Sequence, residues 1–82
     1  MAITKEFLID WYKSKKPIQE LVLLILAEKG VNREDAIINF TRLDLAGPGN
    51  GSILMNSIIE DTIERLGCID IHDKDGNFIG LA

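Results

Sequence analysis

The chain has 82 residues, of which 46% are hydrophobic and 27% are charged. This length supplies one small hydrophobic core, and the composition is too apolar for intrinsic disorder, so we expect a single folded domain over residues 1–82. Nine Lys and Arg residues oppose thirteen Asp and Glu residues, and only two of the basic residues lie beyond residue 42, so the C-terminal half is strongly acidic. Because nucleic acids are bound through clustered basic side chains, this charge disfavours a nucleic acid partner.

The sequence also bears on location and cofactors. Its longest apolar run, residues 21–27, is far shorter than the roughly 20 residues of a membrane span, so we expect no membrane association. No cationic segment followed by an apolar one marks the chain for secretion. Cys68 is the only cysteine, which excludes an internal disulfide and any multi-cysteine metal site. We therefore expect a cytoplasmic protein without a metal or other cofactor.

Residues 4–13 predict an N-terminal helix. Thr4 is a suitable N-cap, and apolar side chains follow it at three- and four-residue spacing. The helix ends before Pro17, because proline cannot continue a helix from behind but fits the first turn of the next one.

Residues 17–67 predict a core of three helices. The first of them, residues 17–30, is apolar on nearly every side between Leu21 and Leu26. A helix that is apolar all round needs neighbours on several faces, so we expect it at the centre of the fold. It ends at Gly30, which readily adopts the left-handed conformation of a helix C-terminus.

The other two core helices flank a glycine-rich loop. Asn32 is a good N-cap for the earlier helix, which ends near Leu45. Residues 52–66 carry apolar side chains on one face and stop at Gly67, which predicts the later helix.

Residues 68–82 alternate apolar and polar side chains around a glycine turn, which predicts a β-hairpin. A two-residue turn would set Ile71 opposite Gly80. A three-residue loop over residues 74–76, with Gly76 left-handed, gathers the apolar residues on one face instead. We therefore expect two apolar cross-strand pairs: Ile71 with Ile79, and Ile69 with Leu81.

The stretch "IIEDTIERLGCIDIHDKDGNFIGLA" resembles the last helix and wing of the winged helix-turn-helix superfamily. The likeness covers residues 18–81 in layout and includes no specific motif, so no single family is implied. It implies an α+β, mostly helical fold: a winged-helix-like three-helix core (17–67), a C-terminal β-hairpin wing (68–82) and an extra N-terminal helix (4–13).

The loop "GPGNGS" is best explained as a turn in which Ser52 or Asn50 caps the following helix. It lacks the lysine of a phosphate-binding P-loop and follows a helix rather than a strand. One alternative is an acyl-carrier-like protein modified at Ser52, because acyl carrier proteins are short and acidic and carry their prosthetic group on a serine that opens a helix. Their Asp-Ser-Leu signature is not present here, where Ser52 follows Gly51.

Two apparent chemical sites fail on position. A calcium loop centred on Gly76 would place Ile71 and Ala82 where carboxylate ligands are required. Cys68, Asp70 and His72 share one side of a strand, but Cys68 and His72 lie roughly 13 Å apart along it, beyond hydrogen-bond reach. We therefore expect a protein without catalytic activity.

Charge placement suggests the function. The outward side of the last helix and the wing are acidic, so we expect a small regulatory or adaptor protein that binds another, basic protein. The predicted protein-binding residues are Glu60, Asp61, Glu64, Asp73 and Asp75. The alternative is a DNA-binding transcription regulator that uses Lys13, Lys15, Lys16, Asn56, Ser57 and Arg65.

The N-terminal helix carries most of the aromatic residues. Aromatic side chains are enriched at the centres of interfaces, so Phe7, Trp11 and Tyr12 are predicted to form a homodimer interface. The alternative is that Phe7 and Trp11 cover the core of their own chain, since so short a chain has little core to spare.

Overall fold

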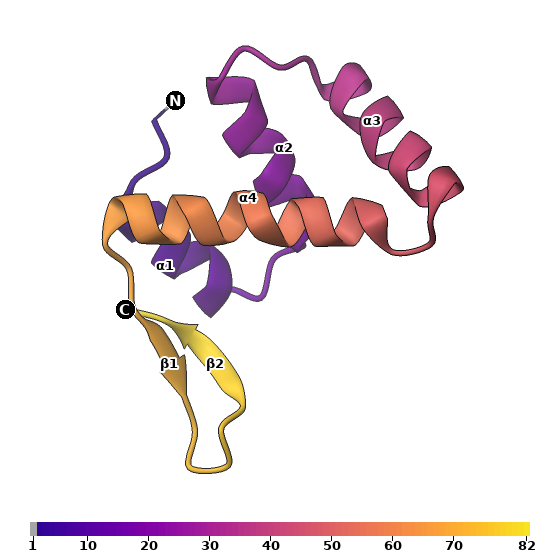
Figure 1. Ribbon diagram of the computed structural model, residues 1–82. Helices are drawn as coiled ribbons and strands as arrows, with labels where there is room; N and C mark the ends of the chain where they lie inside the picture. Colours follow the sequence, from indigo (N-terminus) through magenta and orange to yellow (C-terminus); the bar gives the residue numbers. More distant parts are fainter. Residues whose placement is uncertain (1) are drawn as a thin grey trace.

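Four helices and one two-stranded hairpin follow one another along the chain (Figure 1). The structure, a computed structural model, describes residues 2–82. The fold is α+β and mostly helical, as the sequence predicts, and its order of elements is compatible with a winged-helix-like layout preceded by one more helix. The elements are α1 (Lys5–Lys13), α2 (Ile18–Glu28), α3 (Arg33–Ala46), α4 (Asn50–Leu66), β1 (Asp70–His72) and β2 (Phe78–Leu81).

Local signals in the sequence set the ends of the first three helices. The Thr4 hydroxyl accepts a hydrogen bond from the backbone N–H of Phe7 at 3.1 Å, which caps α1. The Asn32 side chain accepts one from the N–H of Glu34 at 2.7 Å and caps α3 in the same way. Gly30 has a φ of +83°, the left-handed conformation expected directly after α2. These predicted boundaries are confirmed.

Helix α2 lies between two groups of buried side chains. Leu21 and Ile25 pack on one side with residues of α1 and with Leu81 at the end of the hairpin. Val22 and Leu23 pack on the other side with residues of α3 and α4. The predicted central position of this helix is therefore confirmed.

The glycine loop is a turn, but the predicted cap of α4 is wrong. The N-cap is Gly49, with a φ of +87°, and neither Asn50 nor Ser52 occupies that position. A carboxylate from the preceding helix serves the helix start instead, since Asp44 accepts the N–H of Gly51 at 2.8 Å. This places negative charge at the positive end of the α4 dipole.

Gly51 allows α3 and α4 to approach closely. It is buried, and a Cβ atom on it would lie 2.9 Å from the backbone oxygen of Phe40 and 2.9 Å from Oδ1 of Asp44. Because a backbone atom cannot rotate away as a side chain can, any larger residue at this position has to push the two helices apart.

The hairpin has the predicted turn but not the predicted register. Gly76 is left-handed, with a φ of +84°, and its N–H bonds to the carbonyl of Asp73, so the three-residue loop is correct. Beyond His72 and Phe78 the pairing slips by one residue, because Ile79 is an extra residue in β2 and forms a bulge. The expected Ile71–Ile79 and Ile69–Leu81 pairs are therefore wrong: the partners are Ile71 with Gly80, and Asp70 with Leu81.

None of the helices in residues 2–82 combines the length and the apolar character needed to cross a membrane.

We expect Gly51→Ala to destabilise the protein by about 1–3 kcal/mol, because the added methyl group overpacks the contact between α3 and α4. Replacing glycine by alanine inside a helix ordinarily stabilises it by up to about 1 kcal/mol, so the sign is diagnostic. Urea denaturation followed by circular dichroism measures the free energy of unfolding. Ser52→Ala, at the exposed neighbouring position, is the control and should change little. A more stable Gly51→Ala variant would contradict the close contact.

Candidate functional site

The hairpin extends away from the helices, with its turn as the most distant part (Figure 1). Within residues 2–82, Leu81 is the one buried residue of the hairpin, and it packs in the core beside α2. Phe78 adds an edge-to-face contact with Tyr12 of α1, at 5.5 Å between ring centroids. Strand β2 is thus held against α1 from Phe78, next to the turn, to Leu81 at the base, and a space opens between β1 and α4.

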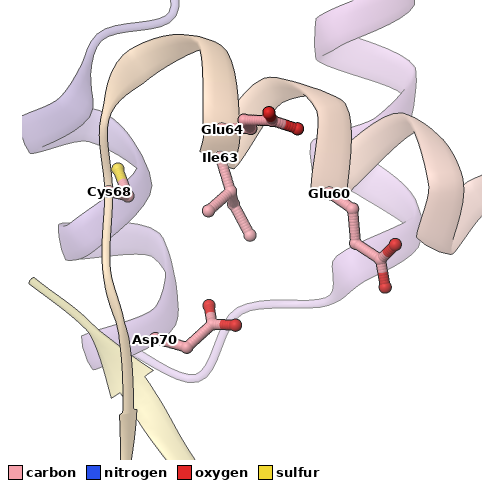
Figure 2. A pocket seen from close by; sticks show the side chains of 5 residues that line it. All are labelled: Glu60, Ile63, Glu64, Cys68 and Asp70. Atoms are coloured by element: carbon pink, nitrogen blue, oxygen red, sulfur yellow. The ribbon is translucent and has the colours of Figure 1, made fainter.

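Two adjoining hollows occupy this space, and together we call them the acidic cleft. The first, of about 280 Å³, is lined by Glu60, Ile63, Glu64, Cys68 and Asp70 (Figure 2). The second, of about 360 Å³, shares Glu60, Ile63 and Asp70 and is also lined by Tyr12, Ile18, Asn56, Ile59 and Phe78.

The periodicity of α4 and the start of β1 bring the acidic groups together. Residues 60, 63 and 64 are three or four apart, so they share one face of the helix. Figure 2 shows Ile63 extending from α4 into the space between the helix and the hairpin, Asp70 extending into it from β1, and Glu60 extending from α4 on the side of this space away from β1. The result is an apolar floor with carboxylates along its rim.

All charged side chains that line the acidic cleft are negative. The one ion pair in residues 2–82 joins Arg33 to Glu20 at 2.7 Å, on α3 and α2, and involves none of the cleft carboxylates. The carboxylates of the cleft are therefore available to a cation from outside the chain.

The environment of the acidic cleft raises the pKa of two side chains that line it, Tyr12 and Cys68. Burial, and then the negative charge of Asp70, raise the pKa of the Tyr12 phenol. Burial also raises the pKa of the Cys68 thiol, and the carboxylates of Glu6 and Asp70 add to this effect against the opposing charge of Lys5. Cys68 is thus a protonated thiol at neutral pH, which is a poor nucleophile.

Two of the five predicted protein-binding residues line the acidic cleft. Glu60 and Glu64 line the acidic cleft, whereas Asp61 lines neither hollow. Asp73 and Asp75 lie in the hairpin turn, away from α4 (Figure 1). Asp73 has a structural role there: its carboxylate accepts the N–H groups of Asp75 and Asn77, each at 2.9 Å, and these bonds lower its pKa.

Sequence reasoning left two contributors out of the binding site. The sequence places Asp70 in the wing and predicts Tyr12 at a dimer interface, yet both line the acidic cleft. The strand pattern did contain part of the signal, because it placed Asp70 on the same side as Cys68, and both residues line the first hollow.

The alternative DNA-binding residues are dispersed. Asn56 lines the second hollow, beside Tyr12 and Ile18. Lys13 lies on another side of the hairpin, in a separate hollow with Ile71 and Ile79. The remaining four, Lys15, Lys16, Ser57 and Arg65, are exposed.

The aromatic residues of α1 make contacts within their own chain. Phe7, Trp11 and Tyr12 are half-buried against the core. The indole N–H of Trp11 donates to the carbonyl of Pro17 at 3.0 Å, and the Lys16 ammonium lies 5.1 Å from the centre of the indole ring. The predicted dimer interface through these three residues stays a prediction.

No group of three or more His, Cys, Asp and Glu side chains in residues 2–82 is placed to hold a metal ion. No protein-family model matches the chain, and searches of curated proteins and of solved structures found no significant match. The properties of the acidic cleft therefore rest on its own residues.

We expect Asp70→Asn to lower the pKa of both Tyr12 and Cys68, because it removes a negative charge that disfavours the phenolate and the thiolate. These are the only tyrosine and the only cysteine of the chain, so ultraviolet titration and the pH dependence of thiol alkylation report on them without ambiguity. Asp75→Asn, which makes the same charge change in the hairpin turn, should leave both pKa values unchanged. Equal pKa values in Asp70→Asn and the parent protein would show that Asp70 does not face the cleft.

Proposed function

We propose that this protein is a small, non-catalytic regulatory or adaptor protein with a winged-helix-like fold, and that it binds a basic segment of another protein in the acidic cleft. The observation that carries the proposal is the combination of three carboxylates, Glu60, Glu64 and Asp70, with an apolar and aromatic floor between α4 and the hairpin.

This combination suits the side chains of lysine and arginine. Such side chains have an apolar stem and a charged end, so the stem can pack on Ile63 while the charge reaches the carboxylates of the rim. The rings of Tyr12 and Phe78 line the same space, and aromatic faces attract cations. A partner with alternating basic and apolar residues meets both requirements.

Repulsion argues against the usual DNA-binding mode of a winged helix, in which the last helix enters the major groove and the wing touches the backbone. Here the cleft side of α4 and the first strand of the wing carry carboxylates instead of lysines and arginines. A labelled duplex tests this alternative, since a DNA binder shifts it at low salt and releases it steeply as salt rises. A salt-sensitive shift would favour the transcription-regulator alternative.

A carrier function at Ser52 has a separate test. Ser52 is exposed in the first turn of α4, and intact mass of the protein purified from its own host would reveal a prosthetic group as a discrete increment. The unmodified mass is the result expected for an adaptor.

We expect the double variant Glu60→Lys with Asp70→Lys to weaken capture of the partner by about tenfold or more, because the cleft then repels a basic segment. The partner is first identified by affinity capture and mass spectrometry, and affinities are then measured with the purified pair. The matched control is Asp61→Lys with Asp75→Lys, which makes the same change in net charge outside the cleft. If both double variants lose affinity for the partner equally, the net charge of the protein and not the acidic cleft controls binding, which would contradict the proposal.

A further inference from the structure

Helix α3 carries apolar side chains on two opposite faces. Ala36 and Phe40 point inward and are 2% and 5% exposed. On the opposite side, Ile38 is 48% exposed and Leu45 is 82% exposed. A helix that packs on one side only should show polar residues on the other, so the outward apolar residues are unexplained by the fold of the single chain.

This outward stripe consists of Glu34, Ile38, Thr41, Arg42 and Leu45, all exposed and spaced at three- and four-residue intervals. Figure 1 shows α3 at the margin of the molecule, with α2 and α4 on its inner side. The stripe shares no residue with the acidic cleft, so an interaction through one leaves the other free.

Charges are placed symmetrically about the centre of the stripe. Glu34 lies four residues before Ile38 and Arg42 four residues after it, each about 6 Å along the helix axis. Within residues 2–82 neither charge takes part in an ion pair. A two-fold axis through Ile38 therefore sets Glu34 of each copy opposite Arg42 of the other.

We propose that the outward stripe of α3 binds a second copy of this chain in an antiparallel, two-fold symmetric helix pair. Ile38 packs against its own counterpart at the axis, and two Glu34–Arg42 pairs flank it. Leu45 of each copy reaches over the beginning of the other α3. A two-fold interface requires a surface that is complementary to itself, and this arrangement of charges meets that requirement.

The size of the contact sets its strength. Helix α3 has 14 residues and is therefore about 21 Å long, so one helix pair buries less than the roughly 1,600 Å² of a standard interface. The dimer is accordingly weak and depends on protein concentration. Its role would be to bring two acidic clefts together on one assembly.

Charge exchange at the two positions tests the proposal. Sedimentation equilibrium should show that Glu34→Arg and Arg42→Glu each weaken dimerisation by about tenfold, because two attractive pairs become repulsive. The double variant carrying both changes should restore the parent affinity, since the charges are complementary again. Circular dichroism melting checks that each variant is folded. Failure of the double variant to recover, or a parent chain that stays monomeric at millimolar concentration, would overturn the proposal.

Disulfide trapping gives an independent readout in the Cys68→Ala background. Ile38→Cys should form a covalent dimer on mild oxidation, because a residue on the two-fold axis meets its own copy. Ile53→Cys, on the exposed side of α4, is the control and should remain largely monomeric. Efficient trapping at position 53 but not at position 38 would refute the α3 interface. A dimer that Trp11→Ala abolishes and that the α3 charge variants leave intact would also refute it, because such a dimer forms through α1.

Discussion

Burial of α2 is the constraint on which the rest of the structure depends. The chain is short, and four of its ten buried hydrophobic residues in the described part belong to this one helix. Leu21 and Ile25 organise one side of the core, and Val22 and Leu23 organise the other. The other three helices and β2 each contribute side chains to these two groups of buried residues. The small core therefore decides which elements pack fully and which remain partly exposed.

The acidic cleft is a consequence of that limit. The hairpin packs against α1 through β2, whose Leu81 joins the core and whose Phe78 contacts Tyr12, while β1 stands clear of α4. The carboxylates on the two sides of the gap are exposed to solvent, and Ile63 and the aromatic rings form an apolar floor between them. A bound segment with basic and apolar side chains would place positive charge beside the carboxylates and cover the apolar floor at the same time. The same limit leaves the outer face of α3 uncovered, where a second copy can supply the missing contact.

Local chemistry made much of the fold predictable, and long-range contacts account for the errors. Thr4, Asn32 and Gly30 mark helix ends through bonds and conformations that involve only near neighbours. The α4 cap was mispredicted because its acceptor, Asp44, comes from another helix. The predicted hairpin register is wrong because β2 contains one extra residue, Ile79, which forms a bulge that the alternation of side chains does not reveal. The sequence shows the acidic residues of the cleft, but it does not show the direction in which the hairpin leaves α4. That direction decides that Glu60, Glu64 and Asp70 lie around one space.

Nuclear magnetic resonance titration of the nitrogen-15-labelled protein with a short peptide of alternating lysine and leucine tests the central claim most directly. The account predicts that amide signals of Ile63, Cys68 and Asp70 shift progressively at low salt, that the shifts shrink as salt is added, and that an alternating glutamate and leucine peptide produces none. Shifts confined to the hairpin turn around Asp75, or equal shifts with both peptides, would contradict the claim that the cleft is a selective site for basic segments.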